Sequence, residues 1–193
     1  MKIQNILSRS IFSLRWKVVI KITNFFRKKY YRLIGMKIGE GTILFSALDF
    51  TWPNQISIGN YVKLEEGISF KFDGIYQPGP RIVIGNNVFI GKYCEFNITH
   101  SITIGTDSLI ASGCKFIDHN HGISKSEIMR LQQCPGKSIV IGNNVWLGVN
   151  TVVLMGVHIG DGAIVGAGAI VNRSIGSNEI WAGVPAKKIG ERY

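Results

Sequence analysis

The sequence is short of acidic residues, and it has none before Glu40. Residues 1–37 nevertheless hold ten lysines and arginines, so the formal charge of +10 belongs to this segment. Positions 38–193 contain twelve basic and twelve acidic residues and carry no net charge. A nucleic-acid binder built around a basic groove is therefore disfavoured, because that function needs the positive charge on the folded body.

Long apolar runs and paired cysteines are also missing. No run reaches the roughly 18 apolar residues of a membrane-spanning helix. Four basic residues between positions 9 and 21 interrupt any stretch that could form the core of a signal peptide. The three cysteines, Cys94, Cys114 and Cys134, are an odd number without metal-site spacing. We therefore expect a cytoplasmic protein without a metal site.

The chain instead contains a six-residue repeat. Ile-Gly pairs begin at positions 58, 84, 104, 141 and 159, and aliphatic residues recur at every sixth position between them. Such residues stack as inward-pointing side chains, and β-branched segments between Gly, Asn and Asp are typical of strands and turns. Three repeats to a turn predict a triangular, all-β solenoid with coils about 18 residues long and roughly 4.8 Å apart.

Longer intervals between repeats mark two insertions, at about residues 72–81 and 118–137. Loops that leave a regular solenoid commonly carry binding chemistry, because the coil holds their ends rigidly. An ice-binding or purely structural solenoid would have no reason for an insertion rich in His and Asp. A β-sandwich would place its turns about every 8 to 12 residues, without the six-residue phase.

Three motifs, in this order, carry a family resemblance: Asp118-His119-Asn120-His121-Gly122, Asn144-Val145-Trp146-Leu147-Gly148 and Ala182-Gly183-Val184-Pro185-Ala186-Lys187. Over about residues 38–193 the sequence resembles the hexapeptide-repeat acyltransferases, and among them the sugar and polysaccharide O-acetyltransferases. The resemblance implies a left-handed parallel β-helix that forms homotrimers, with active sites between subunits. It also implies direct transfer from acetyl-CoA to a hydroxyl of a surface polysaccharide or its precursor, without a metal.

The resemblance assigns roles in the second insertion. His121, which precedes Gly122, matches the family's general base, and a neutral imidazole suits proton removal near pH 7. Trp146 matches a tryptophan that lines the active site. Asp118, His119 and Asn120 are expected to contact the acceptor, and Asp118 or a backbone carbonyl to set the tautomer of the base. The alternatives are His119 as the base, Asp118 as a turn residue, and Trp146 as a surface residue covered by a neighbouring subunit.

The resemblance also implies a cofactor track along an edge of the prism: Gly148, Val149, Ala167, Asn172, Arg173, Lys187 and Lys188. Small residues there let the pantetheine approach the backbone, and the lysines would meet the nucleotide phosphates. The glycine and alanine positions are equally explained by repeat geometry, and the two lysines by a solvated charge pair. His100 and His158 fall on variable repeat positions, where a solvated surface is expected.

Other functions remain open. N-acetylation of a nucleotide-linked amino sugar is the main alternative, because the same base and track serve an amine. A non-catalytic β-solenoid scaffold is another. A γ-type carbonic anhydrase would need three zinc-binding histidines, whereas two of the four here lie only two positions apart.

The N-terminal segment, residues 1–37, is predicted to be a basic amphipathic helix. Its apolar residues follow steps of three and four: Ile3, Leu7, Ile11, Leu14, Val18, Ile22 and Phe25. A helix packed on the solenoid or on a neighbouring subunit would cover the exposed strand edge of the first coil. Alternatively, residues 1–35 could lie on an anionic membrane at its inner face, or attract anionic glycans or lipid-diphosphate-linked sugars.

Overall fold

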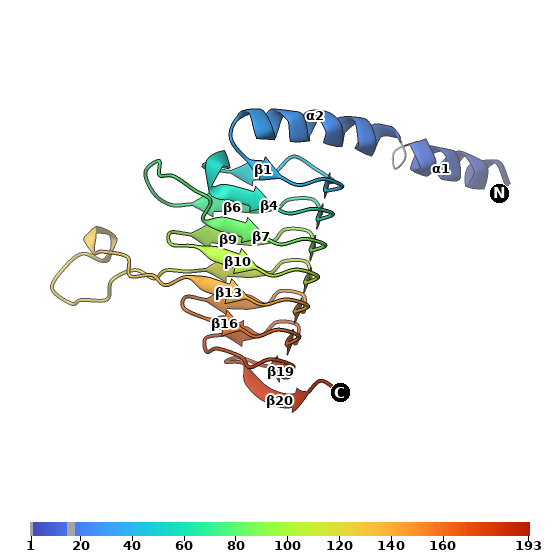
Figure 1. Cartoon of the computed structure of the whole chain (residues 1–193). Coiled ribbons are helices and arrows are strands. Elements are labelled where there is room, and N and C mark those ends of the chain that lie inside the picture. The colour runs from blue at the N-terminus through green and yellow to red at the C-terminus, as the bar shows by residue number, and fades with distance from the viewer. Residues whose placement is uncertain (1, 15–17) are drawn as a thin grey trace.

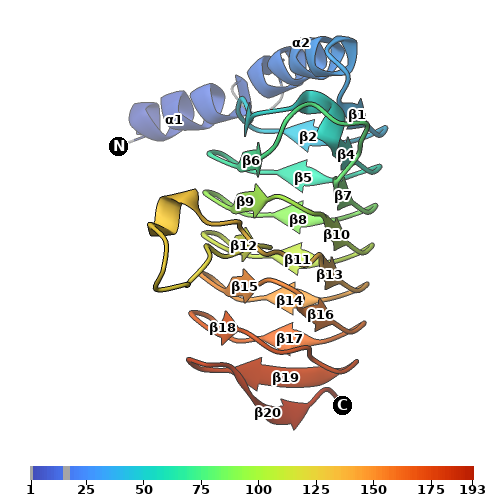
Figure 2. The same ribbon diagram turned by 90° about the vertical axis from the view of Figure 1, so that its left-hand side faces the viewer.

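The computed structural model describes residues 2–14 and 18–193, which form a three-sided β prism with helices across one end (Figure 1). The strands stack in parallel, coil upon coil, into three sheets, except that the last strand, β20 (Lys187–Glu191), pairs antiparallel with β19 (Glu179–Ala182). The chain winds as a left-handed parallel β-helix, so the predicted fold is confirmed (Figure 2). No helix in the described part of the chain is both long and apolar enough to cross a membrane.

The three sheets are named A, B and C in the order in which each coil visits them. Sheet A comprises β1 (Lys37–Ile38), β4 (Ile56–Ile58), β7 (Ile82–Ile84), β10 (Ile102–Ile104), β13 (Ile139–Ile141) and β16 (His158–Ile159). Sheet B comprises β2 (Ile43–Leu44), β5 (Lys63–Leu64), β8 (Phe89–Ile90), β11 (Leu109–Ile110), β14 (Trp146–Leu147), β17 (Ile164–Val165), β19 (Glu179–Ala182) and β20 (Lys187–Glu191). Sheet C comprises β3 (Asp49–Phe50), β6 (Ser69–Phe72), β9 (Glu95–Ile98), β12 (Lys115–Ile117), β15 (Val152–Leu154) and β18 (Ile170–Val171).

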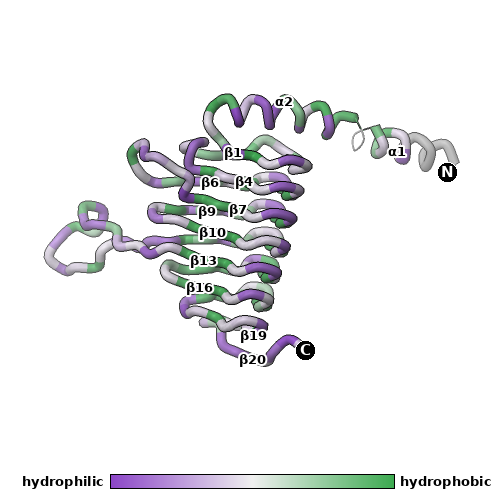
Figure 3. The backbone as a smooth tube through the Cα atoms, viewed as in Figure 1, coloured by the Kyte–Doolittle hydropathy of each residue, from purple (hydrophilic) through white to green (hydrophobic). Residues whose placement is uncertain are grey.

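Hydrophobic segments recur along the stacked coils (Figure 3), and their buried side chains form the core as ladders of equivalent residues. On sheet C the rings of Phe70, Phe96 and Phe116 are buried, with successive centroids 4.8 and 4.7 Å apart. The repeat that the sequence displays is therefore the packing period of the core. Cys94 and Cys114 are buried, and Cys134 is exposed.

Asn and Asp side chains join the coils at the edge between sheets A and B. Asn60 Oδ1 accepts a hydrogen bond from Glu40 N over 2.8 Å, and Asp161 Oδ1 accepts one from Asn143 N over 2.7 Å. These side chains hold the turns of neighbouring coils together. They explain why Asn or Asp follows the Ile-Gly pair in four of the five repeats named above, the exception being Thr106.

Both insertions leave the prism at the edge where the chain passes from sheet C to sheet A, which we call the C–A edge. The first follows β6 and the second follows β12, and both project to the same side (Figures 1 and 2). Trp52 supports the first insertion, since its Nε1 donates to Gly74 O over 3.0 Å and its ring meets Tyr76 edge-on. A short 3-10 helix, η2 (Pro53–Gln55), precedes β4, and another, η3 (Met129–Leu131), lies in the second insertion.

Helix α2 (Ile20–Leu33) closes the open end of the first coil with polar side chains, and α1 (Lys2–Leu14) precedes it. The Asn24 amide donates to Thr42 O over 3.3 Å and accepts from Leu44 N over 2.9 Å. Arg32 donates to Ile38 O through Nε and Nη2, over 3.1 and 2.7 Å. The helix therefore supplies hydrogen-bond partners to the edge strands, which have no preceding coil.

Three more residues of α2 extend this cap. Lys28 Nζ and Arg27 Nη1 donate to carbonyls of the first coil over 3.0 and 3.3 Å. The hydroxyl of Tyr31 accepts from Leu48 N over 3.0 Å, while its buried ring packs edge-on against Phe50. Several residues of the predicted basic segment thus act as a structural cap on the solenoid.

The apolar stripe of the segment does not face the solenoid. Its described members are Ile11 and Leu14 in α1, Val18 just before α2, and Ile22 and Phe25 in α2, and they are between 42% and 60% exposed. Ile3 and Leu7 lie in α1, but their side chains are outside the described part of the chain. The helix covers the first coil, which is one of the alternatives given above, but its apolar stripe stays exposed. The cap forms through the polar face, because edge carbonyls need donors.

Candidate active site

Asp118 anchors the second insertion to the prism. Its carboxylate is fully buried and accepts hydrogen bonds from Thr99 N (2.8 Å), Thr99 Oγ1 (3.1 Å) and His100 N (2.7 Å). A fourth contact joins Asp118 Oδ1 to His119 Nδ1 over 3.1 Å. Because this carboxylate has no exposed surface, its predicted contact with an acceptor is corrected to a positioning role.

The two ends of the insertion form a narrow neck. Asn120 N donates to Pro135 O over 2.9 Å, and Lys137 N donates to Asp118 O over 2.8 Å. His119 and Gly136 face each other across an antiparallel bridge. The neck presents the residues beyond it on the outside of the prism, while the His119 side chain is only 11% exposed.

His121 lies just beyond the neck, and it is exposed. With Asn120, Gly122, Ile123, Pro135 and Met155 it lines a hollow of about 480 Å³. Its Nδ1 lies 3.5 Å from Cys134 Sγ, so the second ring nitrogen, Nε2, is the one left for a ligand. The two histidines of the motif therefore have different surroundings. His119 contacts the Asp118 carboxylate, whereas the His121 side chain is exposed at the hollow.

Trp146 projects from the middle of sheet B, where it is 51% exposed. The three-sided cross-section places sheet B opposite the C–A edge (Figure 2). A single chain therefore does not bring Trp146 to His121. Residues on opposite sides of the prism line one site only when two copies of the chain meet.

Four of the predicted cofactor residues follow the edge where the chain passes from sheet B to sheet C, which we call the B–C edge. Gly148 and Val149 follow β14, and Ala167 follows β17 one coil further. Lys187 begins β20, beside the turn that closes the prism, and it is exposed. A Cβ on Gly148 would lie 2.5 Å from Ala167 N, so close coil packing requires this glycine whether or not a ligand binds.

The other three predicted cofactor residues do not continue this track. Asn172 and Arg173 are exposed on the C–A edge. Lys188 lies next to Lys187, but its Nζ is 2.9 Å from Glu179 Oε1 and 2.6 Å from Glu191 Oε1. The hydrogen bond from Lys188, with those from Gly176 N and Trp181, lowers the pKa of Glu179 to about 2. A phosphate would have to compete with two carboxylates for Lys188.

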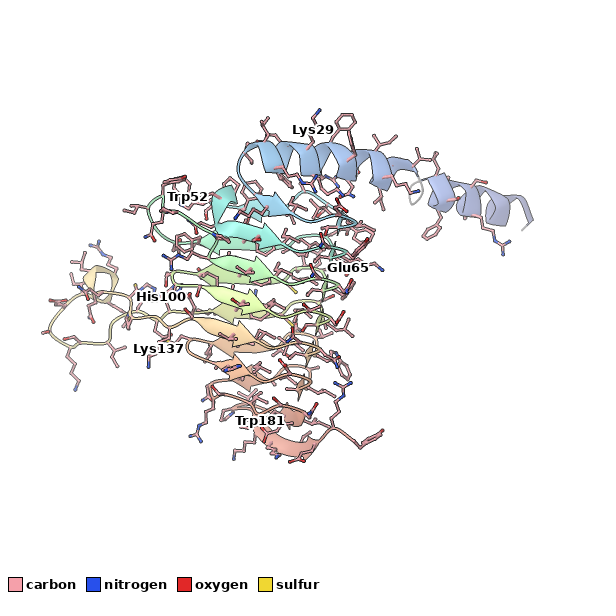
Figure 4. The ribbon with its side chains drawn as sticks, in the orientation of Figure 1. Lys29, Trp52, Glu65, His100, Lys137 and Trp181 are labelled. Carbon is pink, nitrogen blue, oxygen red and sulfur yellow. The ribbon has the colours of Figure 1, made fainter. Side chains whose placement is uncertain are left out.

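Sequence reasoning missed the residues that hold the site together. His100 is exposed, as expected, and Figure 4 places it on the side of the prism from which the insertions project. Its backbone N nevertheless binds Asp118, and its Nδ1 lies 3.0 Å from Thr99 Oγ1. The polar run Asn97-Ile98-Thr99-His100-Ser101, one coil before the insertion, was an available signal. His158 is exposed on sheet A, away from this cluster.

Within residues 2–14 and 18–193, no group of three or more His, Cys, Asp and Glu side chains is placed to hold a metal ion. His119 and His121 point to different surroundings, one to Asp118 and the other to the hollow.

Comparison with known proteins links this geometry to acyltransferases. A family model described as "Hexapeptide repeat of succinyl-transferase" matches residues 81–114 and 138–173. The chain is 30% identical over 161 residues to the putative colanic acid biosynthesis acetyltransferase WcaF of Escherichia coli, an alignment that covers 83% of this chain and 72% of WcaF.

A second relative is the putative lipopolysaccharide biosynthesis O-acetyl transferase WbbJ of Escherichia coli, which is 43% identical over 116 residues. That alignment covers 56% of this chain and 59% of WbbJ, so the chain spans little more than half the length of this relative. Among solved structures, AntD, an N-acyltransferase from Bacillus cereus in complex with a dTDP-amino sugar and coenzyme A, has a TM-score of 0.75 at 21% identity. The likeness covers 86% of this chain and 89% of AntD, and it concerns the fold.

Proposed function

The chain belongs to the hexapeptide-repeat acyltransferase family, and from this premise we propose that it transfers an acetyl group from acetyl-CoA to a sugar hydroxyl. The acceptor is a surface polysaccharide or its precursor. The observation that carries the proposal is the placement of His121, which a rigid neck holds at the mouth of a hollow with Nε2 directed away from Cys134. The names of WbbJ and WcaF support the class of acceptor.

In the proposed reaction, His121 Nε2 takes the proton of the sugar hydroxyl as its oxygen attacks the thioester carbonyl carbon. A bond forms between that oxygen and carbon, and the carbon–sulfur bond then breaks. CoA leaves as a thiolate, which receives the proton from the imidazolium. The indole N–H of Trp146 is a candidate donor to the oxyanion or to the acceptor. No step requires a metal.

The proposal needs more than one copy of the chain. His121 stands on the C–A edge, whereas Trp146 stands on sheet B and the Gly148–Ala167 track follows the B–C edge. A cyclic trimer presents the sheet B side of one copy to the insertion of the next, which gives three equivalent sites between subunits. Asn172 and Arg173, on the same edge as His121, then complete the groove from the other subunit.

Acetyl-CoA would lie along the B–C edge. Val149 and Lys187 are exposed there, on either side of Ala167, and the small residues leave the backbone open to the pantetheine amides. Lys187 would meet a phosphate of the nucleotide. Asn120 and His119 are the remaining candidates for acceptor contacts, although the His119 side chain is only 11% exposed.

N-acetylation of an amino sugar is the second candidate, which the fold likeness to AntD favours. The proposed setting is the cytoplasm at the inner face of the membrane, with peripheral contact through residues 1–35. Incubating purified protein with acetyl-CoA and matched hydroxyl and amino sugars, free, nucleotide-linked and polymeric, separates these functions by product mass. Labelling of amines alone would overturn O-acetylation, and CoA binding without transfer would indicate a scaffold.

His121→Ala tests the base directly. We expect its rate of acetyl transfer to fall by about 10²- to 10⁴-fold, the usual contribution of a positioned general base. His158→Ala is the matched control, since His158 is exposed on a different face. Release of CoA is measured with a thiol reagent, and near-normal activity of His121→Ala would refute the assignment.

A further inference from the structure

We infer that the exposed apolar stripe of α2 lies on the surface of an anionic membrane and holds the prism end-on to it. The stripe consists of Ile22, Phe25, Phe26 and Leu33, with Lys29 among them. This inference deepens the peripheral contact in the proposed function. It does not depend on the acetyl-transfer reaction.

The stripe occupies the side of α2 that faces away from the solenoid. Its four apolar side chains are between 52% and 84% exposed. Their spacing of three, one and seven residues puts them on one face of a helix with 3.6 residues per turn. The opposite face carries Asn24 and Tyr31, which are buried against the first coil.

This orientation reverses the usual amphipathic arrangement, in which a surface helix buries its apolar stripe and exposes its charges. The reversal follows from the cap, because edge carbonyls of the first coil require donors such as Arg32 and Lys28. The apolar residues are left on the outermost surface of the molecule. A cluster of exposed apolar side chains on one helix face indicates a contact with another surface.

The charge around the stripe matches an anionic bilayer. Lys29 projects away from the prism (Figure 4), and it lies between Phe26 and Leu33 in the sequence of α2. A lysine so placed can bury its stem with the apolar groups while its ammonium meets lipid phosphates. Lys21 is also exposed, and no acidic residue precedes Glu40. Polybasic segments with an apolar face are attracted to the anionic cytoplasmic leaflet.

Charge also argues against a second copy as the occupant. Two helical segments placed stripe to stripe would each bring ten basic residues of positions 1–37 and no acid, so they would repel each other. The arrangement of the two helices also favours contact with a flat surface, since α1 and α2 lie across the end of the prism and α1 reaches beyond it (Figure 1).

Vesicle co-sedimentation of the full chain tests the inference. We expect the protein to bind vesicles of phosphatidylcholine mixed with phosphatidylglycerol, to bind phosphatidylcholine alone more weakly, and to lose binding as salt increases. The double variant Ile22→Ser/Leu33→Ser should bind the mixed vesicles more than about tenfold more weakly, because two inserted side chains are lost. Ile75→Ser is the matched control, since Ile75 is 80% exposed at the first insertion.

Absence of binding to the mixed vesicles, or equal binding by the wild type and the double variant, would overturn the inference. A double variant with a smaller oligomeric mass in light scattering and unchanged vesicle binding would identify the stripe as a contact between copies, which also overturns it. Acetyl transfer to a free sugar is measured without vesicles. An inactive protein that still binds membranes would refute the proposed reaction alone.

Discussion

Asp118 Oδ1 lies 3.1 Å from Nδ1 of the adjacent residue, His119, and this contact lies where the second insertion leaves the prism. The same buried carboxylate accepts hydrogen bonds from two backbone N–H groups and a hydroxyl of the preceding coil. The loop that carries His121 is therefore tied to the solenoid through one side chain. His121 itself does not touch it.

We expect Asp118→Asn to lower the free energy of unfolding by roughly 2–4 kcal/mol. One carboxylate oxygen becomes an NH₂ group that faces donors, so buried N–H groups lose their acceptor. Denaturant unfolding measures the change. Asp161→Asn is the matched control, because Asp161 is exposed at an edge position where other coils already use Asn. An equally small effect in both variants would show that the Asp118 network does not stabilise the fold.

We expect Arg32→Ala to destabilise the first coil by about 1–2 kcal/mol, since charge-assisted hydrogen bonds to Ile38 O are lost at a partly exposed site. Hydrogen exchange of the first-coil amides, including Leu44, should become faster. Lys29→Ala, on the outer face of the same helix, should leave these rates unchanged. Protection that is unaltered in Arg32→Ala would mean that the cap is dispensable.

The ion pair at the C-terminal end predicts a pH dependence of stability. Because Lys188 and its neighbours lower the pKa of Glu179 from its ordinary value of 4.5 to about 2, ionised Glu179 favours the folded state. The contribution is fully present above pH 4.5 and is lost as the pH falls from there towards 2. Melting curves of wild type and Glu179→Gln should therefore differ at neutral pH and converge in acid. A constant difference across this range contradicts the linkage.

We expect Lys187→Ala to raise the KM for acetyl-CoA by about five- to tenfold, with a smaller effect on kcat, because a phosphate contact serves binding rather than the chemical step. Lys71→Ala is the control, since Lys71 forms a surface ion pair with Asp73 beside the first insertion. Initial rates at varied acetyl-CoA measure both. An unchanged KM in Lys187→Ala would show that the nucleotide phosphates do not bind Lys187 at this edge.

The solenoid was predictable because its information is local and periodic. Each inward residue, such as Phe96, contacts the equivalent residue of the coils above and below, so one repeated position specifies the whole core. The second insertion could be located for the same reason, as a break in the period. Trp146 immediately precedes the inward-facing Leu147 on β14, and it projects outwards.

The orientation of the N-terminal helix could not be read in this way. Helical periodicity shows that a stripe exists, but it does not say which face meets the solenoid. The decisive interactions join Asn24 and Arg32 to the backbone of the first coil, whose unpaired groups are invisible in a side-chain pattern. The partner of Asp118 was missed for a related reason. Thr99 and His100 are a full coil away in sequence, and a loop has no period from which their contact follows.

Because the coils are evenly spaced, a distance along the prism axis follows from the number of coils between two points. The insertion that carries His121 leaves after the fourth coil, three steps from the coil that α2 covers. At roughly 4.8 Å per step, plus the full width of a helix, its base lies about 25 Å from the outer face of α2. If the stripe of α2 lies on a membrane, as inferred above, a lipid-linked sugar would have to extend about this far from the bilayer to reach His121.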